Sequence, residues 1–387
     1  MDLILGIILG VIVLTLLVAA HEFGHGVIAR RNGVKVEEFG IGFPPKVWGK
    51  KVAKSPLGAH VLYTINWLPL GGFVRLKGEH DDARDDSSYG SKTFWQKTKI
   101  LLAGVAVNWL IAIVLFTGLA FVGLPKIIPN QFMIPADTAV SEGHVILSSV
   151  VAGLPADLAG LRAGDSIVRF NGLPVDSTED LTQKVKDDQG KTADVIYSRN
   201  NIESKVSVSI RADNSDHKGY LGAGLSQQTL YRSTWSAPIV GVVTTFQLTG
   251  ATFQGLGDTL AKTTTGLVGQ LSTDPTARTT ANDDLATAGQ SVAGPIGIFG
   301  VIFPAAEKAG MRQVVLLTAV ISLTLAVMNT LPIPGLDGGR WFLTALFRLL
   351  KRPLTEPLEA KINGIGMTVL MGLIIVITIT DIGKLTR

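Results

Sequence analysis

Four long runs of apolar residues lie along the chain, and each is close to the length that a helix needs to cross a bilayer. These runs are Leu3 to Ala20, Ile100 to Leu124, Val314 to Leu336 and Ile362 to Thr380. A hydrocarbon core of about 30 Å accommodates about 20 helical residues, so we predict four membrane-spanning helices. A fifth uncharged segment, Ser233 to Gly257, is rich in Thr, Ser, Gln and Gly. It predicts an amphipathic stretch at the membrane interface, with a further span as the alternative.

The first apolar run has one feature of a signal peptide, because Val18-Ala19-Ala20 could be a cleavage site. However, Asp2 precedes the run and no basic residue does. The run is also longer than the apolar region of about 7 to 15 residues in signal peptides. We therefore expect a retained membrane helix.

The composition fits a chain that is partly solvated by lipid. The mean hydropathy is +0.36, and charged residues make up 17% of the 387 residues, against about 25% in soluble domains. This balance argues against a soluble globular enzyme and against a disordered or nucleic-acid-binding chain. Cysteine is absent, so any metal must be held by His, Asp or Glu.

Basic residues gather in two loops between or after the predicted spans. Residues 30–99 contain thirteen Lys and Arg, and the loop 340–352 contains four more. Because positively charged loops stay in the cytoplasm, both loops are predicted to be cytoplasmic. The chain then has four spans, both termini outside, and residues 125–312 on the outer face.

Residues 144–225 differ from the rest of the chain, with short Val- and Ile-rich runs separated by Gly and Pro. The expected strands are His144 to Val151, Ser166 to Phe170, Ala193 to Ser198 and Lys205 to Ile210, with a helix at Ser177 to Asp188. This pattern predicts a small α+β domain. Its segment Gly160-Leu161-Arg162-Ala163-Gly164-Asp165, followed by Asn171-Gly172, resembles bacterial PDZ domains. The resemblance implies that a peptide or chain terminus binds at a sheet edge, with a plain spacer domain as the alternative.

Three ionisable residues continue the first apolar run, in His21-Glu22-Phe23-Gly24-His25. Helical residues four apart face the same side, so both histidines can reach one zinc ion while Glu22 lies beside a metal-bound water. Ionisable residues at membrane depth are costly, which favours a function over a helix end that merely reaches solvent. The motif therefore predicts a zinc site with Glu22 as general base.

A catalytic zinc ion takes three protein ligands, and we predict the third at the end of the third span. There the string Asn329-Thr330-Leu331-Pro332-Ile333-Pro334-Gly335-Leu336-Asp337-Gly338-Gly339 breaks the helix with two prolines and then supplies an acid. The first and third spans run in the same direction in the four-span topology, so Asp337 and His25 emerge at similar depth. The carboxamide of Asn329 is expected to bind substrate backbone or the oxyanion, with helix packing as the alternative.

Together these motifs resemble the site-2 protease family of intramembrane zinc metalloproteases, most closely its RseP-like bacterial branch. Members pair HExxH in the first span with NxxPxPxLDG in the third and carry PDZ domains between the second and third spans. The resemblance implies a zinc cofactor, and it assigns roles to seven residues. These are the metal ligands His21, His25 and Asp337, the catalytic Glu22, and the substrate-binding Asn329, Pro332 and Pro334. This chain has one PDZ unit where some relatives have two.

We therefore expect a multi-pass α-helical membrane protein with four transmembrane helices, an inserted membrane-associated β-hairpin and an extracytoplasmic α+β PDZ domain. The hairpin is predicted from Ala59 to Ile65 and Gly71 to Leu76. Its edge is expected to pair with unwound substrate, with a hairpin that makes no substrate contact as the alternative. The predicted regions are 1–125 with the HExxH motif and the hairpin, 140–226 for the PDZ domain, 227–310 for an extracytoplasmic amphipathic segment, and 311–387 with the last two spans.

The expected function is cleavage of single-span membrane proteins within the lipid of a bacterial cytoplasmic membrane. The resemblance implies substrates such as anti-sigma factors already trimmed by another protease, or remnant signal peptides. The active site is expected near the cytoplasmic side, with the PDZ domain as a size filter. The alternatives are an inactive PDZ scaffold in the membrane and a transporter or channel, and no nucleic-acid partner is expected.

Overall fold

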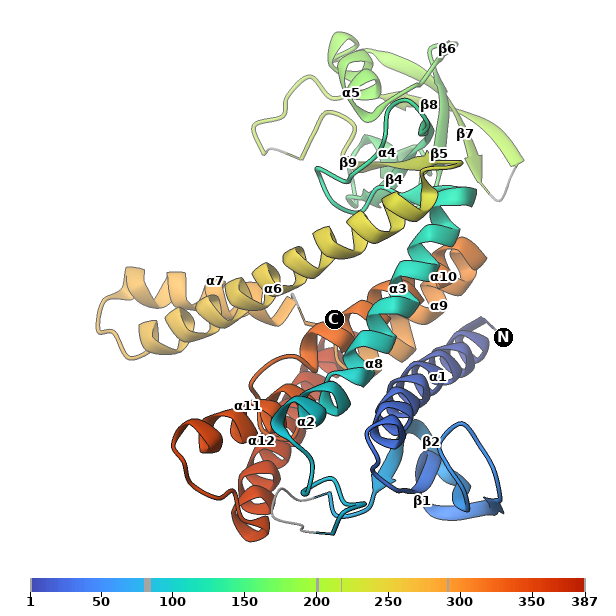
Figure 1. The fold of residues 1–387 in the computed structure, drawn as a ribbon. Coiled ribbons are helices and arrows are strands. Elements are labelled where there is room, and N and C mark those ends of the chain that lie inside the picture. The colour runs from blue at the N-terminus through green and yellow to red at the C-terminus, as the bar shows by residue number, and fades with distance from the viewer. Residues whose placement is uncertain (1, 80–84, 200–201, 217, 291, 386–387) are drawn as a thin grey trace. The chain divides into compact units, whose positions relative to one another are not determined.

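The computed structural model describes residues 2–79, 85–199, 202–216, 218–290 and 292–385 (Figure 1). The chain divides into two compact units. Unit 1 consists of Met1–Gly118 and Gly241–Arg387, and unit 2 is Leu119–Val240. Each unit is described by itself.

Unit 1 is built mainly from helices, two of which continue into unit 2 at one end. The helices are α1 (Asp2–Arg31), α2 (Phe94–Leu101), α3 (Ala103–Val122), α6 (Ala237–Gly269), α7 (Pro275–Gln290), α8 (Pro295–Gly297), the π-helix η1 (Ile298–Ile302), α9 (Phe303–Ala309), α10 (Met311–Met328), α11 (Asp337–Leu349) and α12 (Glu356–Leu385). Within the part of the chain that the structure describes, four helical segments are long and apolar enough to cross a membrane. They are Leu3–Arg31, Phe94–Val122, Met311–Met328 and Glu356–Gly383. Among the described residues, the 33-residue α6 does not meet the same criteria.

Two membrane helices begin or end at other residues than predicted, because of the residues at their ends. The second span begins at α2, where Thr93 and Gln96 form a reciprocal capping box, and the chain turns at Leu102 before α3. The third ends at Met328 instead of Leu336. Two prolines follow within six residues, and proline cannot continue a helix without losing a hydrogen bond. The non-helical segment 329–336 therefore separates α10 from α11.

A buried acid joins the last span to the helices that precede α10. Asp381 of α12 is 3% exposed, and its Oδ2 accepts a hydrogen bond of 2.7 Å from the backbone N–H of Gly297. Ionisable groups are costly at membrane depth unless they find such partners. This contact fixes α8 against α12.

The sheet of unit 1 contains β1 (Val36–Val52) and β2 (Val61–Leu76), which pair antiparallel. Residues 36–41 of β1 pair with residues 72–76, and residues 38–41 also pair with residues 62–65. A strand with two partners must lie between them, so the predicted hairpin needs correction. Its two strands, Ala59 to Ile65 and Gly71 to Leu76, do not pair with each other, because β1 is inserted between them. Segment 72–76 is consequently at an edge of the sheet, and β2 contacts α1.

Unit 2 is a sheet flanked by two short helices. Its strands are β3 (Leu124–Pro125), β4 (Ala139–Val150), β5 (Ser166–Phe170), β6 (Leu173–Pro174), β7 (Thr192–Arg199), β8 (Ile202–Ser209) and β9 (Ala223–Arg232), and its helices are α4 (Pro155–Leu158) and α5 (Thr178–Asp187). The strand order is β3-β9-β4-β5-β7-β8, with β6 beside β5. The hydrophobic pattern predicted β4, β5, β7, β8 and α5. It did not predict β9, whose polar residues Ser226, Gln227 and Gln228 interrupt the apolar pattern.

The core of unit 2 is apolar, with one ion pair at its border. Val145, Ile167, Leu181 and Val195 are at most 1% exposed. Asp165 is also 1% exposed, and its carboxylate accepts two hydrogen bonds from Arg199, of 2.6 and 2.7 Å. Burial alone would raise the pKa of Asp165, but the Arg199 guanidinium and the backbone N–H of Arg162 lower the pKa below its ordinary value.

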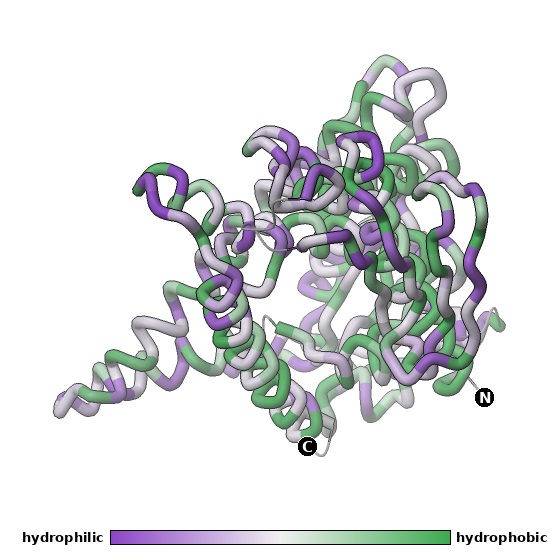
Figure 2. Tube along the Cα trace, turned by 60° about the horizontal axis from the view of Figure 1, so that its bottom comes forward, coloured by the Kyte–Doolittle hydropathy of each residue, from purple (hydrophilic) through white to green (hydrophobic). Residues whose placement is uncertain are grey.

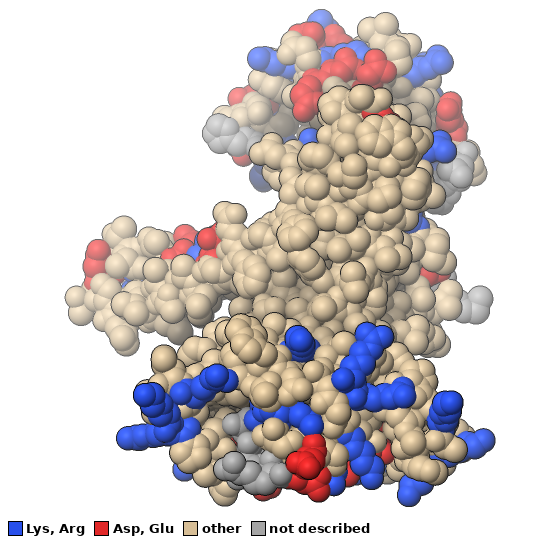
Figure 3. All heavy atoms as spheres, viewed as in Figure 1, with Lys and Arg blue, Asp and Glu red and all other residues tan. Residues whose placement is uncertain are grey.

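The surface of unit 1 separates apolar from charged residues. Hydrophobic residues dominate the trace of the helix that leads to the C-terminus (Figure 2). Lys and Arg side chains gather at the end of unit 1 that holds β1, β2 and α11, whereas the surface of the adjoining helices is almost free of charge (Figure 3). This distribution is what a membrane helix bundle with one basic face requires.

Candidate metal centre and active site

The histidines of the HExxH motif lie on one face of α1, one turn apart. His21 is 5% exposed and His25 is 6% exposed, and their Nε2 atoms are 3.1 Å from each other. The motif lies inside α1, which runs unbroken from Asp2 to Arg31. The helix therefore fixes both rings toward one point within the unit.

Asp337 joins this pair from the first residue of α11. Its Oδ2 lies 2.9 Å from His21 Nε2 and 3.1 Å from His25 Nε2. The segment before it is tied back by a hydrogen bond of 2.8 Å from the Gly338 N–H to the Asn329 carbonyl oxygen. A Cβ on Gly338 would collide with the Thr330 carbonyl, so glycine is needed for this close approach.

The three side chains fit a tetrahedral zinc ion. Their ligand atoms form a triangle with edges of 2.9, 3.1 and 3.1 Å. Zinc bonds of about 2.0 to 2.1 Å at tetrahedral angles place neighbouring ligand atoms about 3.3 Å apart, so a small relaxation would admit the ion. Gly104 of α3 faces the same point, because a Cβ there would lie 2.5 Å from both Nε2 atoms. The absence of a side chain at Gly104 leaves room beside the histidines.

Glu22 lies next to the triangle and contacts the sheet edge. One carboxylate oxygen of Glu22 is within 4.8 Å of ligand nitrogens of both histidines. Its Oε2 accepts a hydrogen bond of 3.2 Å from the backbone N–H of Val74 in β2. This bond holds the carboxylate on the side of the site that faces the edge segment 72–76.

A cavity of about 70 Å³ opens from these residues. It is lined by Glu22, His25, Val74, Leu76, Glu79, Tyr89, Ile100, Leu101, Asp337 and Arg340. Arg340 stands over the Tyr89 ring at 5.6 Å and donates a hydrogen bond of 2.8 Å to the Glu79 carbonyl oxygen. A guanidinium so placed joins the segment that follows β2 to α11, and it gives the wall of the cavity a fixed positive charge.

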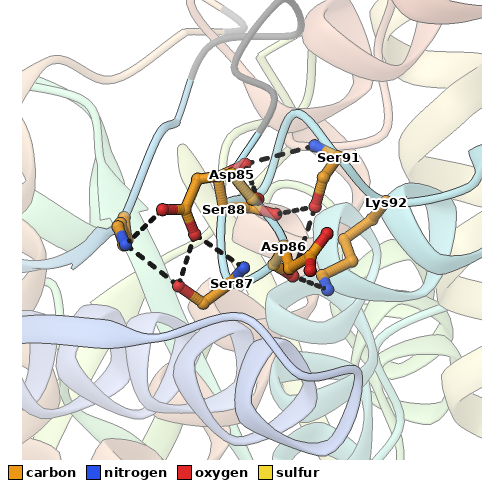
Figure 4. A network of polar contacts seen from close by, with 7 residues as sticks. Asp85, Asp86, Ser87, Ser88, Ser91 and Lys92 are labelled. Atoms are coloured by element: carbon orange, nitrogen blue, oxygen red, sulfur yellow. Dashed lines mark hydrogen bonds and ion pairs between the residues drawn. The ribbon is translucent and has the colours of Figure 1, made fainter.

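A polar network holds the segment that carries Tyr89 (Figure 4). Asp85 accepts hydrogen bonds from Lys77 Nζ at 2.9 Å and from the Ser87 backbone N–H at 2.9 Å. The Lys77 hydrogen bond, followed by that of Ser87, lowers the pKa of Asp85 far below its ordinary value. Ser88 and Ser91 extend the network toward Lys92 (Figure 4), so the loop is internally bonded where it reaches the cavity.

The structure brings together four of the seven residues that the sequence singles out. His21, Glu22, His25 and Asp337 meet at one point, whereas Asn329, Pro332 and Pro334 do not line the described cavity. The Asn329 carboxamide instead donates a hydrogen bond of 3.0 Å to the Leu325 carbonyl of its own helix.

Sequence reasoning missed Gly104, Tyr89 and Arg340. Neither composition nor local pattern marks Gly104 or Tyr89, and the roles of all three depend on contacts between distant segments. Only Arg340 carried a signal, as a basic residue three positions after Asp337.

The fold and the site define a membrane-spanning metalloprotease, and comparison with known proteins agrees. Peptidase family M50 matches residues 9–373, so the chain belongs to this family, the site-2 proteases, and is a zinc metalloprotease. The chain is 25% identical over 456 residues to the regulator of sigma-W protease RasP of Bacillus subtilis, covering 97% of each chain. It is 24% identical over 461 residues to the zinc metalloprotease RasP of Shouchella clausii, covering 96% of this chain and 97% of the relative.

Two solved structures match a smaller part of the chain. The PDZ domain of the SdrC-like protein from Listeria monocytogenes is 22% identical, with a TM-score of 0.20 over 21% of this chain and 86% of that domain. The second domain of the Listeria protein Lin2157 is 28% identical, with a TM-score of 0.19 over 22% of this chain and 82% of that domain.

Proposed function

We propose that this zinc metalloprotease cleaves single-span membrane proteins within or beside the lipid, with His21, His25 and Asp337 as metal ligands. One observation carries the proposal. A carboxylate 316 positions from His21 in the chain lies within 3.1 Å of both Nε2 atoms. Such convergence of two imidazoles and one acid leaves a fourth tetrahedral position free, as a catalytic zinc site requires.

Glu22 is the general base and acid in this proposal. When bound, zinc supplies Lewis-acid polarisation of the scissile carbonyl and lowers the pKa of the attacking water. Glu22 takes the proton of that water and returns it to the leaving amide nitrogen. The Val74 N–H, 3.2 Å from Oε2, holds the carboxylate in position for both transfers. The carboxylate that accepts the proton is thereby fixed by the sheet edge.

The substrate segment is proposed to bind as an added strand along residues 72–76. A helical substrate hides its peptide bonds, so it must unwind before it can be cut, and a sheet edge can hold the extended chain. Val74 and Leu76 point their backbone N–H groups away from β1, toward the carboxylates of Glu22 and Glu79. Glu79, which accepts from the Leu76 N–H at 2.7 Å, would have to move when a strand is added, whereas the Val74 N–H stays on Glu22 and is not offered to the substrate.

Asn329, Pro332 and Pro334 are proposed to contact the substrate on the other side of the site. They lie in the non-helical segment before Asp337, and Pro332 is exposed. In this proposal the Asn329 carboxamide leaves the Leu325 carbonyl and donates to substrate backbone, since a free amide can satisfy an unwound peptide group.

We further propose that the chain lies in a bacterial cytoplasmic membrane with both termini outside and the active site toward the cytoplasm. The basic end of unit 1 supports this orientation (Figure 3). Unit 2 then lies outside, where a PDZ-like domain would act as a size filter for substrates already trimmed by another protease. The name of the Bacillus subtilis relative, a regulator of sigma-W protease, makes anti-sigma factors the substrate class to test first, with remnant signal peptides second.

The PDZ domain predicted at 140–226 falls within the sequence range of unit 2. Residues 241–310 of the predicted extracytoplasmic segment belong to unit 1, where α9 contacts α1 and Gly297 donates to Asp381 of α12. Both RasP alignments extend over more positions than the 387 residues of this chain. Those relatives therefore carry segments without a counterpart here, which supports a single filter domain in place of two.

The test compares the wild-type protein with Glu22→Gln in detergent, on a panel of single-span model substrates, with and without a zinc chelator. We expect cleavage by the wild type alone, its loss with chelator, and zinc still bound to the variant. Equal cleavage by Glu22→Gln, or cleavage that ignores the chelator, would contradict the mechanism. Absence of cleavage in both proteins over the whole panel would favour the scaffold.

A further inference from the structure

Asn108 of α3 is a buried polar residue at the site to which the mechanism assigns no role. It is 1% exposed and lies one helical turn after Gly104, on the face of α3 that meets the two histidines. Its Nδ2 atom lies 3.3 Å from His21 Nδ1. Its Oδ1 atom is buried and has no hydrogen-bond partner among the described residues. An unpaired buried oxygen costs about 1 to 3 kcal/mol, so its presence asks for an explanation.

The other histidine shows which hydrogen bond a metal ligand needs. His25 Nδ1 lies 2.7 Å from the Ile100 carbonyl oxygen, which only accepts hydrogen bonds. His25 therefore carries its proton on Nδ1 and presents the lone pair of Nε2 to the point shared with His21 and Asp337. A histidine that binds metal through Nε2 commonly donates its Nδ1–H in this way.

His21 must meet the same condition if it binds zinc through Nε2. Its Nδ1 then carries a proton and needs an acceptor, yet the carboxamide presents an N–H group there. A half-turn of the Asn108 carboxamide exchanges its oxygen and nitrogen at nearly unchanged volume. The orphaned Oδ1 then accepts the Nδ1–H of His21, and the carboxamide nitrogen takes the position that Oδ1 held.

We propose that Asn108 is a positioning residue, whose Oδ1 accepts the Nδ1–H of His21 and so directs the Nε2 lone pair at the zinc ion. The inference rests on the proposed zinc ligands. The backbone of Asn108 is fixed from the far side, because Ser322 of α10 donates a hydrogen bond of 2.8 Å to its carbonyl oxygen. The ligands are thus oriented by two consecutive helices, His25 through the Ile100 backbone carbonyl of α2 and His21 through the Asn108 side chain of α3.

Three variants distinguish whether the Asn108 side chain accepts a hydrogen bond from His21, donates one to it, or only packs against it. Asn108→Leu keeps the volume and removes both polar atoms, and Asn108→Asp keeps an acceptor and removes the donor. Ser322→Ala is the matched control, since it loosens the same contact between α3 and α10 without touching the His21 ring. Zinc affinity is measured by competition with a chelating dye on purified full-length protein in detergent, without substrate.

We expect Asn108→Leu to bind zinc about 10- to 100-fold more weakly, the range for loss of a partner of a ligating histidine. Asn108→Asp should stay within a few-fold of the wild type, and so should Ser322→Ala. Equal loss in the Leu and Asp variants would mean that Asn108 donates, and unchanged affinity in Asn108→Leu would mean that it only packs. Either result overturns the inference. A wild type that binds no zinc would instead overturn the proposed function.

A second measurement keeps the inference testable if Asn108→Leu fails to fold. The chain has only 6 histidines, so the wild type labelled with [15N]histidine gives few ring signals, and His21→Ala assigns those of His21. We expect the Nδ1 signal of His21 in the zinc-loaded wild type at a protonated, pyrrole-like position. A pyridine-like Nδ1 would exclude the proposed hydrogen bond, whatever the variants do.

Discussion

Asp165 of unit 2, which is buried, and Asp337 of unit 1, which is half-buried, differ in what compensates their charge. Asp165 of unit 2 accepts two hydrogen bonds from Arg199, whose guanidinium carries a permanent charge. Asp337 of unit 1 faces the Nε2 atoms of two histidines, which carry a fixed charge only when protonated. The negative charge of Asp165 is balanced by a side chain of the protein. The carboxylate of Asp337 is instead placed to bind a cation together with the two histidines.

The surroundings of the two acids support this difference. Next to Asp337 stand Gly104, which leaves space beside both Nε2 atoms, and Glu22, a second acid. Next to Asp165 the backbone N–H of Arg162 supplies a third hydrogen bond of 2.7 Å, and the residue is 1% exposed. An acid whose charge is matched by a permanent cation of the chain needs no metal ion, although removing that partner would leave an uncompensated charge. An acid that faces two neutral imidazoles with room beside them indicates a metal site.

The largest effect in this comparison is expected from Asp337→Asn. Loss of the anionic ligand should lower zinc affinity more than about 100-fold, beyond the loss of a partner of a ligand. Cleavage should fall on the order of 1000-fold, because the Lewis acid is lost with the ion. Both are measured on purified protein, by dye competition and by cleavage of a model substrate. Thermal stability without zinc should hardly change, and wild-type cleavage by this variant would remove Asp337 from the ligands.

Filling the space beside the histidines is expected to have the next largest effect. In Gly104→Ala the new Cβ would lie 2.5 Å from both Nε2 atoms, so the rings must move apart. We expect at least about a 10-fold loss of zinc affinity, as for other changes that disturb ligand orientation. Gly118→Ala on the same helix is the matched control, because a Cβ there meets nothing within 4 Å. Equal affinity of the two variants would contradict the close approach of α3.

An intermediate effect is expected from Arg199→Leu, which leaves the Asp165 carboxylate buried without its partner. Unit 2 should lose stability, by less than a fully buried pair would cost because Arg199 is partly exposed. Hydrogen exchange of the β5 and β7 amides, read by mass spectrometry on the full chain, measures this loss. Zinc affinity should be unchanged. Reduced zinc binding would show that the two acids are not independent.

The same pair predicts a pH dependence with a definite sign. The pKa of Asp165 is lower in the folded protein than its ordinary value of 3.8. Its stabilising contribution is therefore fully present above about pH 4 and decreases as the pH falls further. Exchange protection of β5 should follow this course in the wild type and show a weaker acid dependence in Arg199→Leu.

The smallest effect is expected from Asp85→Asn in the loop network of Figure 4. The carboxylate is exposed, so its bonds with Lys77 and Ser87 order the loop but add little to global stability. Thermal stability should not change measurably, and cleavage should stay within about two-fold, the scale of exposed pairs. Because the pKa of Asp85 is lowered, the network persists from neutral pH down to its ordinary value and is lost only below it. A large loss of cleavage would assign the loop a direct role.

Residue type and local spacing predicted much of the site, because each motif lies within one segment. The four spans follow from uninterrupted apolar length, and the HExxH motif places two imidazoles on one helical face wherever that helix lies. Asp337 could also be predicted from the sequence, because it follows directly after the two prolines that end the third span. Functional residues at helical spacing, and residues that end a helix, can be recognised from the sequence without knowledge of tertiary contacts.

The partners of these residues were decided by tertiary structure alone. Asn108 is 87 positions from His21 in sequence, and Val74 is 52 positions from Glu22. The insertion of β1 between the two halves of β2 likewise followed from pairing that no local pattern specifies. The physical reason is that a hydrogen bond between distant segments depends on how helices and strands pack, and packing is decided by many weak contacts at once. The sequence alone determined which residues perform the proposed chemistry, and the fold decided what holds them in place.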